Sequence, residues 1–224
     1  MKSLQRAASI AAFLIVIAML IHNLNALYLE PYTLGFADKA KDYGNMAKIE
    51  NALWSFSFTS SGISHMVVGV SMMILGLFLS EAFKQSLPIA SRLIFLTATL
   101  SGLGFLLTGI SDIPGTVYAG ILRDLNPAQN TEILLTTTLL RGMVNVLAIF
   151  WLGCFAGMVA WSAKQTESFS RGFRVFGWFN VLPGIMSLYF PPAGFAYIQL
   201  LPLWMLWLGL RLPHLQVSTD AMNQ

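Results

Sequence analysis

ILLTTTLLRGMVNVLAIFWLGCFAGMVAW, residues Ile133–Trp161, is the stretch that decides the fold class of this chain. It contains one charged residue, Arg141. An α-helix needs about 20 predominantly apolar residues to cross the hydrocarbon core of a bilayer, and this stretch is longer. We therefore expect a membrane-spanning helix here, long enough to tilt or to project beyond the bilayer.

The composition of the whole chain leads to the same class. Of the 224 residues, 56% are hydrophobic and only 10% are charged, and the mean hydropathy is +0.67. Soluble domains carry about 25% charged residues, so this chain cannot cover a surface that faces water. We predict an all-α, polytopic six-transmembrane-helix bundle that forms one integral membrane domain over residues 1–224. Its six apolar segments are Ala7–Tyr28, Leu53–Leu79, Ile89–Ile110, Ile133–Trp161, Phe173–Tyr189 and Phe195–Leu210.

The distribution of basic residues predicts the orientation. If the N-terminus is cytoplasmic, eight Lys and Arg residues fall in cytoplasmic segments and four in outer ones, as the positive-inside rule requires. The eight are Lys2, Arg6, Lys84, Arg92, Lys164, Arg171, Arg174 and Arg211. All six tyrosines then fall at or beyond the outer helix ends, as in an interfacial aromatic belt. We therefore expect both termini in the cytoplasm and a multi-pass protein of the cell inner membrane.

Two outer connections are longer than a turn requires. Asp38–Trp54 could form an amphipathic helix, and Thr116–Leu125, bracketed by Pro-Gly and Asn-Pro pairs, could form a short helix on the membrane surface. In the fourth segment Gly153 and Gly157 form a G-x-x-x-G motif, which predicts close packing against another helix.

Arg141 is the strongest candidate for a functional residue. An ionisable side chain inside hydrocarbon is costly and marks a functional site by default. Asn145 lies four residues away, on the same helix face. Asp112, at the outer end of the third segment, is the natural partner of Arg141, and Glu132 is the second choice. Two alternatives stay open: Arg141 snorkels to the outer interface, or it makes a single structural ion pair.

A small polar stripe leads toward Asp112 along the third segment. Thr97, Ser101, Gly104 and Thr108 recur at steps of three and four residues and therefore share one helix face. The stripe could line a site. It could equally be a packing surface, because small and hydroxylated residues let membrane helices approach closely.

Two histidines lie on neighbouring apolar segments. His65 is placed near mid-membrane, with Ser61 on the same helix side, and His22 is placed at least one helical turn closer to the outer face. The pair could ligate haem, bind a metal or relay a proton, although the difference in depth argues against shared haem. Structural histidines with hydrogen-bond partners are the simpler interpretation. No cofactor is therefore expected, with haem or metal at His22 and His65 as the weaker alternative.

These polar residues come from five helices and fall in the central or outer half of the bundle. We expect them to form a polar pocket that faces the outer compartment and binds or transports a small amphipathic or anionic molecule. The alternatives are a haem or metal redox subunit or enzyme, and an accessory subunit without a ligand. The predicted ligand-binding residues are Arg141, Asp112, Asn145, His65, Ser61, His22, Thr108 and Gln199.

The remaining features limit the partners. Neither a phosphate-binding loop nor a nucleophile motif occurs, and whether the chain is an enzyme stays open. The dispersed basic residues argue against nucleic acid as a partner; the lipid bilayer is the expected one, and a homo-oligomer or a larger membrane complex is plausible for so small a bundle. A basic, Ala-rich start and the run from Leu201 to Arg211 loosely resemble small bacterial six-helix proteins grouped as a domain of unknown function. That resemblance implies the helix count and no activity.

Overall fold

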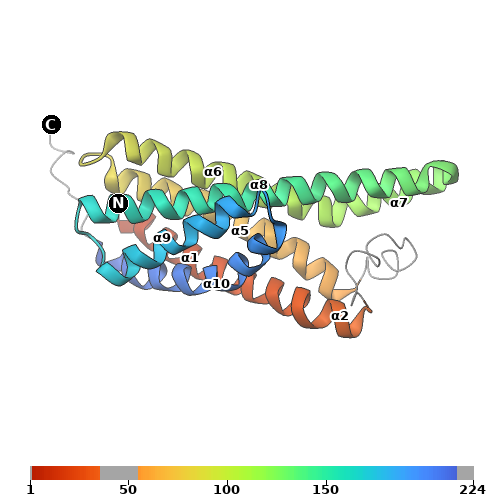
Figure 1. Ribbon diagram of the computed structural model, residues 1–224, viewed down its shortest axis with the longest axis horizontal. Helices are drawn as coiled ribbons and strands as arrows, with labels where there is room; N and C mark the ends of the chain where they lie inside the picture. Colours follow the sequence, from red (N-terminus) through yellow and green to blue (C-terminus); the bar gives the residue numbers. More distant parts are fainter. Residues whose placement is uncertain (1, 36–54, 216–224) are drawn as a thin grey trace.

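The computed structural model describes residues 2–35 and 55–215, and all the regular secondary structure of these residues is helical (Figure 1). The predicted helix at Asp38–Trp54 lies outside the described residues. In chain order the elements are α1 (Lys2–Leu24), η1 (Asn25–Leu29), α2 (Glu30–Thr33), α5 (Phe56–Phe83), α6 (Pro88–Ile110), η2 (Ser111–Gly115), α7 (Thr116–Leu125), η3 (Pro127–Gln129), α8 (Asn130–Gln165), α9 (Arg171–Met186), α10 (Pro191–Arg211) and η4 (Leu212–His214).

Each predicted apolar segment coincides with one long helix, so the expected all-helical fold of membrane type is confirmed. Five helical rods of the described residues are long and apolar enough to cross a bilayer: Lys2–Thr33, Thr59–Phe83, Pro88–Ile113, Thr138–Gln165 and Pro192–His214. The sixth helix, α9, has 16 residues and is about 24 Å long, against a hydrocarbon core of about 30 Å. Length and composition thus give five or six crossings.

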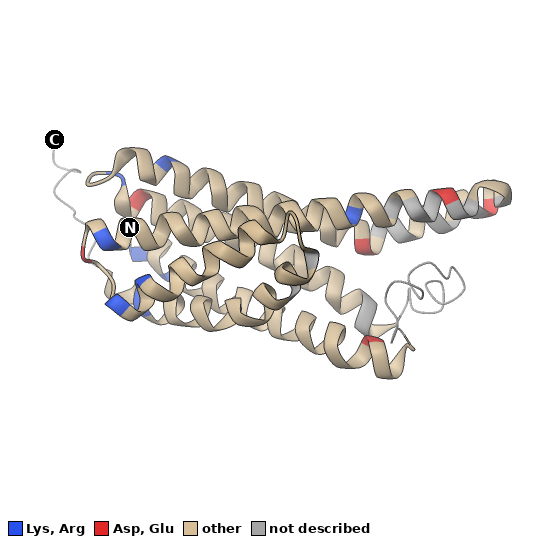
Figure 2. Ribbon diagram, viewed as in Figure 1, with Lys and Arg blue, Asp and Glu red and all other residues tan. Residues whose placement is uncertain are grey.

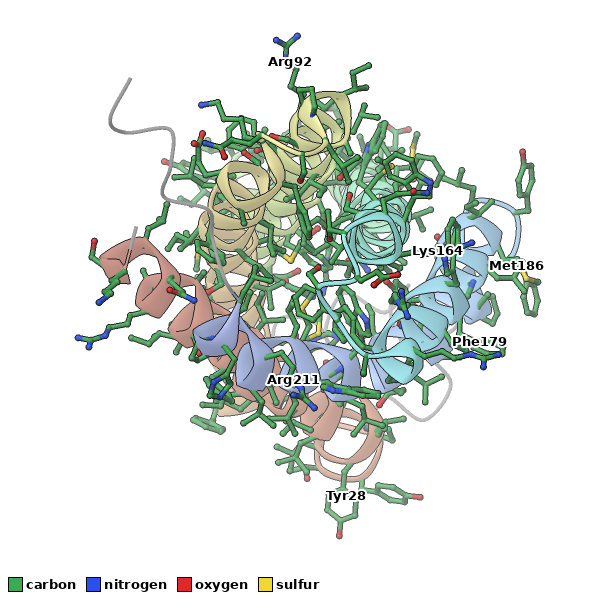
Figure 3. All side chains as sticks on the ribbon, turned by 90° about the vertical axis from the view of Figure 1, so that its left-hand side faces the viewer. Tyr28, Arg92, Lys164, Phe179, Met186 and Arg211 are labelled. Carbon is green, nitrogen blue, oxygen red and sulfur yellow. The ribbon has the colours of Figure 1, made fainter. Side chains whose placement is uncertain are left out.

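The long helices form a closed ring. Each one packs against the next in the order α1, α5, α6, α8, α9 and α10, and α10 packs back against α1 (Figure 3). Large side chains fill the ring: Phe173 stacks on Trp204 with ring centroids 5.3 Å apart, and Phe155 meets the same indole edge-on at 6.2 Å. Because such groups bury much apolar area, this part of the interior is solid.

Glycines bring α5 and α6 close together. Gly69 and Gly102 face each other, and a Cβ atom added to either would lie 2.6 Å from the other's carbonyl oxygen. Gly62 and Gly109 form the same kind of contact two turns further along, next to Asp112. This spacing on α5 fixes the distance between the two helices and brings α5 against the start of η2.

The G-x-x-x-G prediction is confirmed. A Cβ atom added to Gly153 would lie 2.9 Å from the Cα atom of Gly184, and one added to Gly157 would lie 2.8 Å from Val181. The motif therefore packs α8 against α9, as close approach of small residues allows.

Polar contacts tie the last helix to the first. Ser9 donates a hydrogen bond to the carbonyl oxygen of Gly209 over 2.9 Å, and the Gln5 amide donates to that of Leu212 over 2.7 Å. Nearer the other end, Asn23 accepts a 2.9 Å hydrogen bond from Gln199. The seam between α1 and α10 is thus fixed at both ends.

The helix predicted at Thr116–Leu125 forms as α7, but its placement differs from the prediction. It continues the direction of α6, and the first part of α8 then runs back antiparallel to it. The hairpin formed by α7 and the start of α8 projects past the end of the bundle (Figure 1). The π-helical segment η2 joins α6 to α7 without a turn, which is why α7 does not lie across the helix ends.

Charge separates along the bundle. Both ends of the described chain lie at the same end of the bundle (Figure 1), and most of the Lys and Arg positions coloured in Figure 2 lie there. Tyr28, Tyr32, Tyr118 and Tyr189 are exposed, as an interfacial belt requires. Tyr197 is 1% exposed and belongs to the core, so its placement in that belt was wrong.

Candidate functional site

Two π-helical segments position the site. η1 interrupts the first rod at Asn25–Leu29, and η2 interrupts the third rod at Ser111–Gly115. π-helical segments are rare and often occur at functional sites. In η1 the Asn25 amide donates a 2.8 Å hydrogen bond to Ser60, and η2 presents Asp112. Both segments therefore direct a polar group toward α5.

Asp112 is the centre of the site. Its side chain is 1% exposed, and its two oxygens have different partners: Oδ2 lies 2.8 Å from Nδ1 of His65, and Oδ1 pairs with Nε of Arg141. The predicted pairing of Asp112 with Arg141 is confirmed. A carboxylate in a low-dielectric interior needs such compensation, and here it comes from α5 and α8 at once.

His65 is oriented by this carboxylate. An ionised carboxylate only accepts hydrogen bonds, so Nδ1 of His65 is the donor in this contact. In the neutral form of the ring, Nε2 is then the unprotonated nitrogen. The residue is 4% exposed, and among the described residues Nε2 has no hydrogen-bond partner. Phe105 stacks on the ring with centroids 6.1 Å apart, which restricts its rotation.

His22 lies beside His65. The two ring centroids are 4.6 Å apart, which is less than the pitch of about 5.4 Å for one helical turn, so the predicted depth difference of a helical turn or more was wrong. Nδ1 of His22 is 3.0 Å from the hydroxyl oxygen of Ser61. Ser64 and both histidines help to line a cavity of about 10 Å³, which is enough for about one water molecule.

The distance between the rings of His22 and His65 can be compared with the distance expected if both ligated one haem iron or metal ion. Two imidazoles on opposite sides of one metal ion, with metal–nitrogen bonds of about 2 Å, would have ring centroids roughly 6 Å apart. The observed 4.6 Å is shorter, and both Nδ1 atoms already have partners. In the described part of the chain, no group of three or more His, Cys, Asp or Glu residues could hold a metal ion.

The other predicted site residues lie outside this cluster. Thr108 is buried but donates to the carbonyl oxygen of Gly104, one turn earlier in its own helix. Gln199 bonds Asn23 at the seam between α1 and α10. Asn145 is half-buried on α8, and its Oδ1 atom finds no hydrogen-bond partner in the described residues. Thr108 and Gln199 therefore have packing contacts, and the site itself is Ser61, His22, His65, Asp112 and Arg141.

The π-helical segments and the Phe105 wall were not predicted from the sequence. Pro114 gives a partial signal for η2, because a proline has no N–H for the helical hydrogen-bond ladder. Comparisons with protein-family models, with curated proteins and with solved structures found no match to this chain. The resemblance at the chain ends thus stays a prediction.

Proposed function

We propose that the protein is a binding or transport component of a membrane that takes a small anionic or amphipathic molecule at the end of the bundle where Arg141 lies. The observation that carries the proposal is the arrangement around Asp112. One carboxylate, 1% exposed, holds two cationic or potentially cationic groups from different helices, and one of these, Arg141, is still 24% exposed.

The depth of the cluster supports access from one side. At 1.5 Å per residue, Arg141 lies about 35 Å along α8 from Lys164, and Asp112 lies about 30 Å along its rod from Arg92. A hydrocarbon core of about 30 Å that begins at the basic end therefore ends at the level of this pair. By the positive-inside rule the basic end is cytoplasmic, so the site faces the outer compartment of the inner membrane.

The surroundings of the cluster favour a molecule with a charged and an apolar part. Arg141 pairs with Asp112, and protonation of either histidine would add a positive charge to the cluster. The cavity next to the histidines is otherwise lined by apolar side chains, among them Met19, Val68 and Ile198. Its volume of about 10 Å³ is too small for an organic ligand, so such a molecule binds outside this cavity, with its charge at Arg141.

Thermal melting in detergent tests the proposal. The panel contains acetate, hexanoate and phosphate, with 1-hexanol as the uncharged control. We expect at least one anion, hexanoate first, to raise the melting temperature of the wild type, and hexanol not to do so. The double variant Asp112→Asn/Arg141→Gln removes both charges together, and in it the anion effect should disappear.

A melting temperature of the double variant near that of the wild type shows that the loss of binding is not a loss of folding. If no anion shifts the wild type, the binding proposal fails, and the accessory-subunit alternative explains the cluster as a structural ion-pair network.

A further inference from the structure

We propose that Nε2 of His65 is a proton-binding site and that the proton taken up there accompanies binding of the anion at Arg141. The second part of this proposal rests on the proposed function; the first part stands on the geometry of His65 alone. The ligand is thus a proton from the outer solution, which forms an N–H bond at Nε2 and is released there again.

The unused nitrogen of His65 carries the argument. A buried acceptor without a partner is destabilising, and such a group in a native structure calls for an explanation. His65 is 4% exposed, its Nε2 has no partner within the described residues, and the hydrogen bond to Asp112 holds the ring in the tautomer in which Nε2 is basic. This is the arrangement by which a carboxylate prepares a histidine as a base.

A path for the proton begins at the neighbouring ring. His22 is half-buried and lies 4.6 Å from His65 between ring centroids, and both rings line the same small cavity. His22 is therefore a polar group that lies beside the buried ring of His65 and itself reaches the surface.

The charges around His65 make its protonation matter to an anion. From α1 it faces His22, from η2 Asp112, and beyond Asp112 the guanidinium of Arg141 on α8; Phe105 of α6 and Ile198 of α10 contribute only apolar contacts. Asp112 and Arg141 carry opposite charges. One proton at Nε2 adds a positive charge to the cluster, which favours an anion beside it. Histidine is the side chain whose charge normally changes between pH 5 and 8.

The first experiment needs no anion. Protein labelled with ¹⁵N in the histidine rings is reconstituted in nanodiscs, and the ring signals are assigned with His65→Gln, His22→Gln and His214→Gln. At pH 8 we expect His65 to carry its proton on Nδ1, and to gain a second one at Nε2 as the pH falls to 5. A His65 ring that holds its hydrogen on Nε2 at pH 8, or that does not change between pH 8 and pH 5, overturns the proposal.

The second experiment measures coupling. Calorimetric titration of hexanoate, in buffers that differ in ionisation enthalpy, should show uptake of up to one proton per anion bound, and the affinity should rise by at most about tenfold per unit of pH decrease between pH 8 and 6. His65→Gln should abolish the uptake. His214→Gln should not, because His214 is exposed and follows the last helix at the basic end.

The two proposals can fail separately. Hexanoate that binds with no proton uptake overturns the coupling and leaves the proposed function intact. A His65 that titrates at Nε2, in a protein that binds none of the panel anions, refutes the proposed function and supports the proton site.

Discussion

A carboxylate as deeply buried as Asp112 is tolerable only while its charge is compensated. Two compensating groups reach it, one on each oxygen, and they arrive from α5 and α8. Removal of either one therefore affects more than a single contact, because the charge that remains has no water to replace the lost partner. Through Asp112 the two contacts together also link α5 and α8, which are separated in the ring by α6.

Arg141→Ala should lower the stability by about 3 kcal/mol, near the low end for breaking a buried pair, because part of the Arg141 side chain is exposed. The double variant Asp112→Asn/Arg141→Gln should recover most of this loss, since no buried charge remains without a partner. Thermal melting of the two variants and of Asp112→Asn alone checks the expectation. Equal losses in Arg141→Ala and in the double variant would show that the pair is not coupled.

At the scale of elements, glycine contacts set the distance between α5 and α6, and with it the geometry of His65 and Asp112. These contacts are close backbone approaches, so even a methyl group has no room. Gly142 in α8 does not have a close neighbour of this kind, because a Cβ atom added to it would meet nothing within 4 Å. The chain thus provides its own matched control.

Gly69→Ala should destabilise the protein by about 1–3 kcal/mol through overpacking, because its Cβ atom would lie 2.6 Å from the carbonyl oxygen of Gly102. Gly142→Ala should leave the stability unchanged or raise it slightly, since alanine is the better helix former. Thermal melting of both single variants checks this. A Gly69→Ala protein as stable as Gly142→Ala would mean that α5 and α6 can separate at little cost.

The sequence predicted elements better than it predicted the contacts between them. Long apolar runs define helices by length alone, and Arg141 and Asp112 were paired correctly because two charges in apolar surroundings have few other partners. The predicted difference in membrane depth between His22 and His65 was wrong, because the sequence composition does not show helix tilt or the π-helical segment η1. Tyr197 was misplaced for a related reason: an apolar helix gives no sign of which face it buries.

At the scale of the whole molecule, both described chain ends lie at the basic end of the ring (Figure 2), which requires an even number of crossings if each rod crosses once. Since an even count excludes five crossings, the short helix α9 decides whether the rods make six crossings or four. With α9 as a crossing, the turn between α9 and α10 reaches the same side as the α7–α8 hairpin. Without it, α9 and α10 enter and leave from the basic end, and α10 does not cross either.

Cysteine accessibility distinguishes these topologies. In a Cys154→Ala background, which removes the sole native cysteine, Asp124→Cys and Tyr189→Cys should react with an impermeant maleimide in intact cells. Ser86→Cys and Glu167→Cys, in the connections at the basic end, should react only after permeabilisation. Labelling of Asp124→Cys but not of Tyr189→Cys from outside would show that the α9–α10 hairpin does not cross.

The seam between α1 and α10 has a consequence for biogenesis. A ribosome delivers α1 before α10, so Ser9 and Asn23 emerge long before Gly209 and Gln199, their eventual hydrogen-bond partners. Until α10 has been made, the polar side of α1 must be shielded by the translocon, by lipid headgroups or by an insertion factor. Chains that terminate before α10 would expose that side to the bilayer, and membrane proteases should remove them.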